Sequence, residues 1–231
     1  MNCNKKDPIQ ARFFMLNEAL ATDDSRKCLQ HIYCDGVKIV STNGRMLVIT
    51  DNSEHLEKGF YDLATAGTGR NKRMKFVPVA DEKAKEWDYP NWKQIVPSGE
   101  SLTHEVRLEP EQIEAGLKFL KTVPEKMPYN PIELKMSADK RLVLSADDGL
   151  EVTLDAELLG DWTDFSQSLN KNILSRLFAE KHTRIQLSNL NLPLMATGGL
   201  GRYIAMPMRN APIKTQPQNQ PQIQPNKEPQ A

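Results

Sequence analysis

The chain has 231 residues with 30 basic and 30 acidic side chains, so its formal net charge is zero. This balance argues against a tight, generic nucleic-acid binder, which needs clustered positive charge, but it leaves room for a locally basic surface. The sequence has no signal-peptide pattern and no apolar run of about 18 residues, which predicts no membrane-spanning helix. Three cysteines, an odd number, fit a reducing compartment, and we expect a cytoplasmic protein.

Three segments share one layout, in which an amphipathic helix is followed by short strands and tight turns. The first helix is predicted to begin at Asp7-Pro8, because Asp caps helices and Pro suits the first helical position. Strands are expected at 29–34, 37–42 and 46–50. Asp35-Gly36 and Asn43-Gly44 lie between them and predict hairpin turns.

The second and third units repeat this layout. The second has a predicted helix from Glu109-Pro110, and the third has one from about 169 to 181. Each is followed by three strands, predicted at 132–136, 141–146 and 150–155, and at 183–188, 193–197 and 202–206. The pattern predicts an α+β fold built from repeated units of a helix and an antiparallel sheet.

Residues 64–86 interrupt this repeat. The basic cluster at 70–75 is expected to be either a solvated loop or a contact with backbone phosphates. The charged residues 81–86 predict a short polar helix.

The last folded element is predicted at Tyr203–Arg209, directly before a tail rich in Pro and Gln. Ile204, Met206 and Met208 alternate as on a half-buried strand, but Pro207 cannot donate a ladder hydrogen bond, so the strand should end near an edge. Two flexible thioethers at a surface suit peptide binding, and the alternative is a core strand with an irregular end. Residues 211–231 hold six Gln and five Pro and are expected to be disordered.

The sequence predicts no enzyme, no cofactor and no metal site. It has no Gly-x-Ser-x-Gly elbow, no Gly-x-x-x-x-Gly-Lys loop and no His-Glu-x-x-His motif. The glycines at 198–201 precede a strand and not a helix, so a turn is expected there. Cys28, His31 and Cys34 would not all face one side of a strand, which argues against a metal site.

Three stretches resemble the bacterial DNA polymerase III beta sliding clamp. Arg26–Leu29 with the strand and turn at 39–47 is similar to its middle domain, Tyr89–Pro97 to its interdomain linker, and Tyr203–Arg209 to its terminal motif. The resemblance covers most of residues 8–209 and implies a DNA clamp fold, with sheets outside and helices lining one face. It implies a shortened clamp-like domain (1–97), a second clamp-like domain (98–210) and a tail (211–231).

The resemblance implies a sliding clamp, or polymerase processivity factor, that encircles duplex DNA without reading its sequence and tethers DNA polymerase and clamp-loader peptides in a groove. Ring closure implies a homo-oligomer, a trimer of two-domain subunits or a tetramer if only three half-units fold. The short first domain motivates an alternative, an adaptor or decoy that binds such peptides without encircling DNA. Matched residue by residue, the groove would be formed by Arg26, Leu29, Thr42, Gly44, Arg45, Met46, Leu47, Pro90, Ile95, Leu194, Met206, Pro207, Met208 and Arg209.

The resemblance also implies a basic surface towards the DNA. Lys118 and Lys121 lie three residues apart, on one face of a helix. Acidic residues lie on the same helices, so an ordinary solvated helix face is the alternative. The cations expected to face DNA are Arg12, Arg70, Lys72, Arg73, Lys118, Lys121, Lys171, Arg176 and Lys181.

Overall fold

A computed structural model describes residues 8–67, 73–125, 130–163, 165–188 and 192–208. Its strands form two antiparallel sheets, with ten strands in the order β10-β6-β12-β13-β14-β3-β2-β1-β4-β5 and four in the order β11-β7-β8-β9. The strands are β1 (Ile32–Cys34), β2 (Lys38–Thr42), β3 (Met46–Asp51), β4 (Gly59–Ala66), β5 (Arg73–Pro78), β6 (His104–Arg107), β7 (Pro131–Met136), β8 (Leu142–Ala146), β9 (Glu151–Leu154), β10 (Glu157–Leu159), β11 (Ser166–Asn170), β12 (Arg184–Leu187), β13 (Leu194–Gly198) and β14 (Gly201–Ala205).

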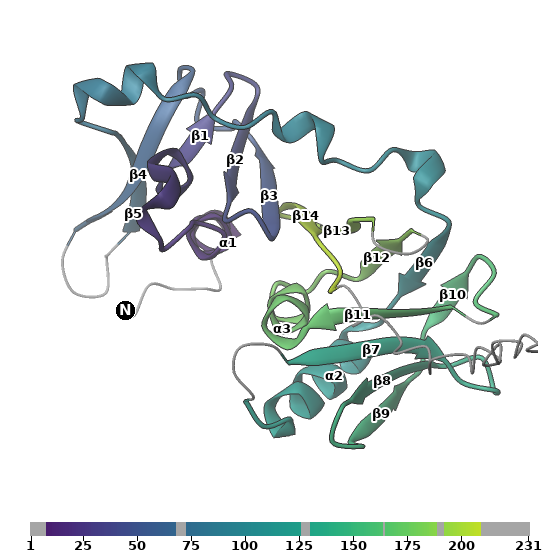
Figure 1. Ribbon diagram of the computed structural model, residues 1–231. Helices are drawn as coiled ribbons and strands as arrows, with labels where there is room; N and C mark the ends of the chain where they lie inside the picture. Colours follow the sequence, from purple (N-terminus) through teal and green to yellow (C-terminus); the bar gives the residue numbers. More distant parts are fainter. Residues whose placement is uncertain (1–7, 68–72, 126–129, 164, 189–191, 209–231) are drawn as a thin grey trace, which may run out of the picture.

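Three α-helices lie on the inner side of these sheets (Figure 1). Helix α1 (Pro8–Glu18) contacts β2, β3 and β5, whereas α2 (Pro110–Thr122) packs on α3 (Lys171–Ala179) and on β9. Pro8 and Pro110 begin their helices as predicted, because the missing N–H of proline costs nothing at the first position. Short 3₁₀ helices are η1 (Asp24–Gln30), η3 (Glu82–Glu86), η4 (Trp92–Gln94) and η5 (Gly99–Ser101).

The ten-stranded sheet has an apolar layer on each face. On β3, Met46 and Val48 belong to the inner core with the helices, whereas Leu47 and Ile49 belong to a second layer on the outer face. This second layer, the outer cluster, also contains Leu29, Val40, Phe60, Tyr89, Trp92 and Ile204. The segment from β5 to β6 runs across this face (Figure 1), so its aromatic residues shield the sheet from water.

The sheet is continuous because β14 pairs with β3. Ile204 lies opposite Leu47 and Tyr203 opposite Val48 in this antiparallel ladder. The pairing joins the last strand of the chain to the first helix-and-sheet unit. This pairing places the end of β14 beside the turn between β2 and β3.

The α+β architecture is confirmed, with differences at several boundaries. Leu29 lies in η1 and not in a strand, and Leu169 lies in β11, so α3 begins later than predicted. Asn170 caps α3 by accepting a hydrogen bond from the Asn172 N–H at 2.9 Å. The short helix predicted at 81–86 is confirmed as η3. The β4–β5 hairpin and strands β6, β10 and β11 were not predicted.

Candidate peptide groove and DNA-facing surface

The turn between β2 and β3 is held by side-chain hydrogen bonds. Asn43 Oδ1 accepts from the N–H groups of Arg45 and Met46 at 3.0 and 3.1 Å, and Thr42 Oγ1 donates to the Met46 carbonyl at 2.6 Å. Gly44 adopts a φ of +83°, which glycine reaches without steric cost. The turn therefore presents the exposed Arg45 at a defined place.

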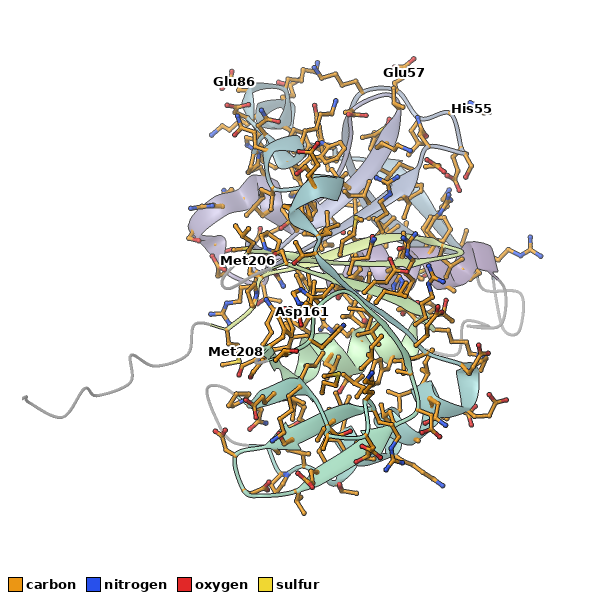
Figure 2. All side chains as sticks on the ribbon, turned by 90° about the vertical axis from the view of Figure 1, so that its right-hand side faces the viewer. His55, Glu57, Glu86, Asp161, Met206 and Met208 are labelled. Carbon is orange, nitrogen blue, oxygen red and sulfur yellow. The ribbon has the colours of Figure 1, made fainter. Side chains whose placement is uncertain are left out.

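The chain leaves the ten-stranded sheet beside this turn. Strand β14 ends at Ala205, the Met206 N–H donates to the Arg45 carbonyl at 2.9 Å, and the Met208 N–H donates to the Ser168 carbonyl of β11 at 2.8 Å. The expected end of the strand ahead of Pro207 is confirmed, but β14 lies between β13 and β3 and not at an edge of the sheet. Figure 2 shows Met206 and Met208 on the same side of the molecule, with Met206 level with the end of β14.

Large apolar side chains are exposed after the end of β14 and on the linker. Met206 is 39% exposed, and Ile95 of the linker is also 39% exposed. The linker is anchored by Trp92, which is buried in the outer cluster, and by Tyr89, whose ring stacks on Tyr33 with centroids 4.7 Å apart. Exposed apolar side chains of this kind suit contacts with a hydrophobic peptide.

Two residues predicted for the groove lie on the opposite face of the sheet. Met46 is 3% exposed in the inner core, where its Sδ accepts from the Tyr203 hydroxyl at 2.9 Å, and Leu194 is fully buried in the same core. This correction follows from strand alternation, because Leu47 and Met195, their neighbours in sequence, face the outer cluster.

The other predicted groove residues differ in their exposure to solvent. Leu29, Thr42 and Leu47 are buried, and Pro90, Pro207 and Met208 are partly buried. Arg26, Gly44 and Arg45 are exposed, whereas Arg209 lies outside the described residues. Their part in a groove stays a prediction.

The three α-helices surround an open hollow of about 1100 Å³. Phe14 of α1, Leu117 of α2 and Leu200 of the β13–β14 turn contribute its apolar lining. Its charged side chains are mixed in sign, namely Glu18, Lys121, Glu125, Lys171, Arg176, Glu180 and Lys181. The hollow is therefore not strongly basic.

Two cations predicted to face DNA are engaged inside the protein. Lys171 is 7% exposed, and its Nζ donates to the Val123 carbonyl at 2.6 Å. Arg12 is 8% exposed, donates to Ser53 Oγ at 2.6 Å and forms an ion pair with Glu54. Burial lowers the pKa of Arg12 from its ordinary value. These side chains tie loops and helix ends together, so their prediction as DNA contacts is corrected.

Arg176 links α3 to α1 across the hollow. Its guanidinium donates to the Glu18 carbonyl at 2.6 Å and lies 3.6 Å from the Glu18 carboxylate. Its Nη1 also lies 3.4 Å from Met46 Sδ, the same sulfur atom that accepts a hydrogen bond from the Tyr203 hydroxyl. Burial raises the pKa of Tyr203 to about 12, although the positive charge of Arg176 opposes this shift.

Four of the remaining predicted cations are exposed in the described part of the chain. Lys118, Lys121 and Lys181 are exposed on or beside the helices, and Arg73 is exposed on β5. Arg70 and Lys72 lie outside the described residues. Contact of Lys118, Lys121 and Lys181 with DNA stays a prediction.

No group of three His, Cys, Asp or Glu side chains that could hold a metal ion occurs among the described residues. His31 Nδ1 is 2.6 Å from Asp62 Oδ1, and Cys34 Sγ is 3.6 Å from the Leu56 carbonyl. Within the same part of the chain, no helix is both long and apolar enough to cross a membrane.

Sequence reasoning missed the aromatic cover of the outer face. Tyr33, Phe60, Trp87 and Tyr89 form a chain of ring contacts, with centroids 4.7 to 6.0 Å apart. The available signal was the density of aromatic residues between 87 and 92 in a segment otherwise rich in charge.

The chain matches no protein-family model and no curated protein sequence. It is similar in structure to the DNA polymerase III beta sliding clamps of Thermotoga maritima (TM-score 0.62, 16% identity, 88% of this chain and 64% of that chain) and Pseudomonas aeruginosa (0.62, 15%, 87% and 65%). It is also similar to the Bartonella birtlesii clamp bound to griselimycin (0.62, 13%, 88% and 64%). The chain thus spans slightly less than two thirds of each clamp. From residue patterns, topology and these comparisons together, the chain has the fold of the bacterial DNA polymerase III beta sliding clamps.

Proposed function

We propose that this protein is a DNA sliding clamp, a processivity factor without enzymatic activity whose copies encircle duplex DNA and tether DNA polymerase and clamp-loader peptides. The observation that carries the proposal is the clamp fold over 88% of the chain. Exposed Met206, directly after β14, and exposed Ile95, on the linker, are apolar side chains of the kind that a short peptide would need. Tethering raises the local concentration of the partner on its template.

The proposed ring is made of several copies of this chain. Residues 1–97 and 98–210 would form its two clamp-like domains, and the match corresponds to 64% of the Bartonella birtlesii clamp. We propose a trimer, with a tetramer as the outcome expected if three helix-and-sheet units are the building block. Light scattering at micromolar concentration, with and without DNA, gives the number of copies, and a strict monomer under both conditions would contradict the ring.

Retention on circular DNA tests encirclement directly. A closed ring loaded on nicked circular duplex should stay bound through a high-salt wash and leave when the DNA is linearised, because topology and not affinity holds it. Equal loss from circular and linear DNA would show that the protein does not encircle the duplex.

The adaptor alternative is favoured by one observation. Before residue 110, α1 is the only α-helix in the described part of the chain, and the β4–β5 hairpin leads directly into the linker. A protein that binds the peptides without closing a ring would bind them normally and show no retention on circular DNA.

Met206→Ala tests the peptide groove that both the sliding-clamp proposal and the adaptor alternative require. Removing a thioether that contacts an apolar ligand should weaken a short hydrophobic clamp-binding peptide roughly tenfold, measured by fluorescence polarisation. Leu150→Ala, at an exposed apolar position in the β8–β9 turn, is the matched control and should bind as the unchanged protein does. Unchanged binding by the Met206 variant would remove this residue from the groove.

A further inference from the structure

Strand β5 forms one end of the ten-stranded sheet (Figure 1). It pairs with β4 on one side, and no strand in the described part of the chain pairs with it on the other. Unpaired strand edges are templates for association with other chains, so natural sheets usually protect them. Two features of β5 fit this rule, because Lys75 is exposed and Pro78 cannot donate a hydrogen bond.

The ladder between β4 and β5 shows which backbone groups face outward. In an antiparallel pair, alternate residues direct their N–H and C=O groups away from the neighbouring strand. The Val79 N–H donates to the Phe60 carbonyl of β4 at 3.0 Å, so Val79 faces β4. Counting back along the strand, the backbone groups of Phe76 and Met74 therefore face outward.

The side chain of Gln10 hydrogen-bonds with these outward groups at Met74. The Met74 N–H donates to Gln10 Oε1 at 2.7 Å, and Gln10 Nε2 donates to the Met74 carbonyl at 3.4 Å. Gln10 is only 4% exposed. Because a glutamine amide carries the same C=O and N–H groups as a peptide unit, this contact reproduces the two hydrogen bonds that an added strand would make to Met74.

Packing of α1 against β5 holds this contact in place. Phe13 and Met74 form a buried cluster, and the Phe13 and Phe76 rings lie 4.7 Å apart between centroids. The edge itself is not covered by bulk, because an open hollow of about 360 Å³ lies along residues 73–76. Hydrogen bonding by Gln10, and not steric cover, is therefore what protects this part of the edge.

Helix α2 makes a similar contact with the other outer sheet. Both α1 and α2 begin with proline, and Gln10 and Gln112 are the third residues of their helices. Gln112 Oε1 accepts a hydrogen bond from the Asp155 N–H at 3.0 Å, directly after the end of β9, which lies at one end of the four-stranded sheet. Gln112 makes this one bond beyond its strand, whereas Gln10 makes two bonds within β5.

We propose that Gln10 is an edge cap, whose amide makes the hydrogen bonds that an added strand would make to Met74 and so prevents β5 from pairing with a strand of a second copy of this chain. The proposal does not depend on ring formation. If copies form the proposed ring, they meet without backbone pairing at Met74.

Hydrogen exchange of single amides in the unchanged full chain, followed by NMR at low and high protein concentration, tests the cap. The Met74 N–H should be protected. The Phe76 N–H, which also faces outward but is not bonded to Gln10, should exchange roughly tenfold faster or more at both concentrations. Equal protection of the two amides would overturn the proposal. Protection of Phe76 that rises with concentration would also overturn it, because a second strand would then cover the edge.

Gln10→Met keeps an unbranched side chain of similar length and removes both hydrogen bonds. Exchange of the Met74 amide should become roughly tenfold faster or more at low concentration. Light scattering at high concentration should show species larger than those of the unchanged protein. Gln94→Met, at an exposed position in η4, is the control and should scatter as the unchanged protein does. Equal scattering by the two variants would overturn the proposal. If Gln10→Met does not fold, the exchange comparison in the unchanged protein decides.

Discussion

His182 is a buried histidine without a charge partner. The residue is 1% exposed, and its ring lies 5.8 Å from the Tyr203 ring, while a backbone contact with Thr197 offsets only part of the effect of burial on its pKa. Burial lowers the pKa of His182 to about 4, because the charged imidazolium would be desolvated. In the unfolded chain the group has its ordinary pKa of 6.5.

This difference predicts acid sensitivity. The unfolded state binds the proton first, so the contribution of His182 to stability is complete above pH 6.5 and is lost progressively as the pH falls towards about 4. The loss should reach about 3 kcal/mol, measured as the free energy of unfolding in urea at several pH values. His182→Met should flatten the profile in this range, whereas His55→Gln, at an exposed position, should leave it unchanged. An identical slope in the His182 variant would assign the acid sensitivity elsewhere.

Gly116 sets the spacing between α2 and α3. A Cβ there would lie 2.3 Å from Phe178 Cε2 and 3.3 Å from Leu154 Cδ1, and Phe178 is fully buried. Gly116→Ala should therefore destabilise the protein by about 1 to 2 kcal/mol despite the better helix propensity of alanine. Gly99→Ala, where a Cβ meets nothing within 4 Å, is the control in the same thermal unfolding experiment. If Gly116→Ala were more stable than the unchanged protein, α2 and α3 could move apart at little cost in free energy.

At the scale of elements, Arg176 joins α3 to the end of α1. Replacing it with Gln removes the hydrogen bond to the Glu18 carbonyl and the ion pair with its carboxylate. We expect a loss of about 1 to 2 kcal/mol in the free energy of unfolding. Lys181→Gln, in the same hollow but exposed, should change it by less than about 0.5 kcal/mol. Equal effects of the two variants would show that the α1–α3 link contributes nothing.

The elements best predicted from sequence are those fixed by local chemistry. The Asn43–Gly44 turn and the end of β14 before Pro207 depend on neighbouring backbone groups, and both were found. The β4–β5 hairpin was missed because Leu63, Met74 and Phe76 are widely spaced among charged residues, and their apolar partner, Phe13, lies on α1.

The direction of single side chains was less predictable. Met46 contacts Tyr203, which is 157 residues away, and Lys171 donates to Val123 across two helices. A lysine or methionine at the boundary between the apolar and polar faces of an element can point into the core or towards solvent. Its direction depends on a partner that is distant in the sequence. The cavity of about 520 Å³ beside Gly201 could not be foreseen either, since its lining comes from five separate segments, namely α1, β2, the end of β3, the linker and the β13–β14 turn.

At the scale of the molecule, the helix-lined hollow combines exposed lysines with carboxylates. Such a surface would hold DNA weakly and without sequence preference, as a sliding contact requires. Leu47 of the proposed peptide groove belongs to the outer cluster, on the face of the ten-stranded sheet opposite the core that contacts the helices, so in the proposed clamp DNA and peptides would use different faces.

Lys118→Gln combined with Lys121→Gln tests this surface. The double variant should bind a short linear duplex several-fold more weakly, and the slope of log K against log salt should fall by up to about 2, because two phosphate contacts are lost. Its retention on circular DNA at high salt should persist, since the ring would hold by topology. A salt slope identical to that of Lys83→Gln, which removes an exposed cation of η3, would place the DNA elsewhere.

The pairing of β14 with β3 also has a consequence for biosynthesis. Leu47 pairs with Thr42 of β2 on one side, but its partner on the other side is Ile204, so that edge of β3 stays unpaired on the ribosome until almost the whole described chain has been made. Unpaired edges template wrong associations, and contacts between distant residues form slowly. The nascent protein therefore passes through a long interval in which its first sheet is open on one side. Chaperone binding or truncation after residue 198 should act on that open edge of β3.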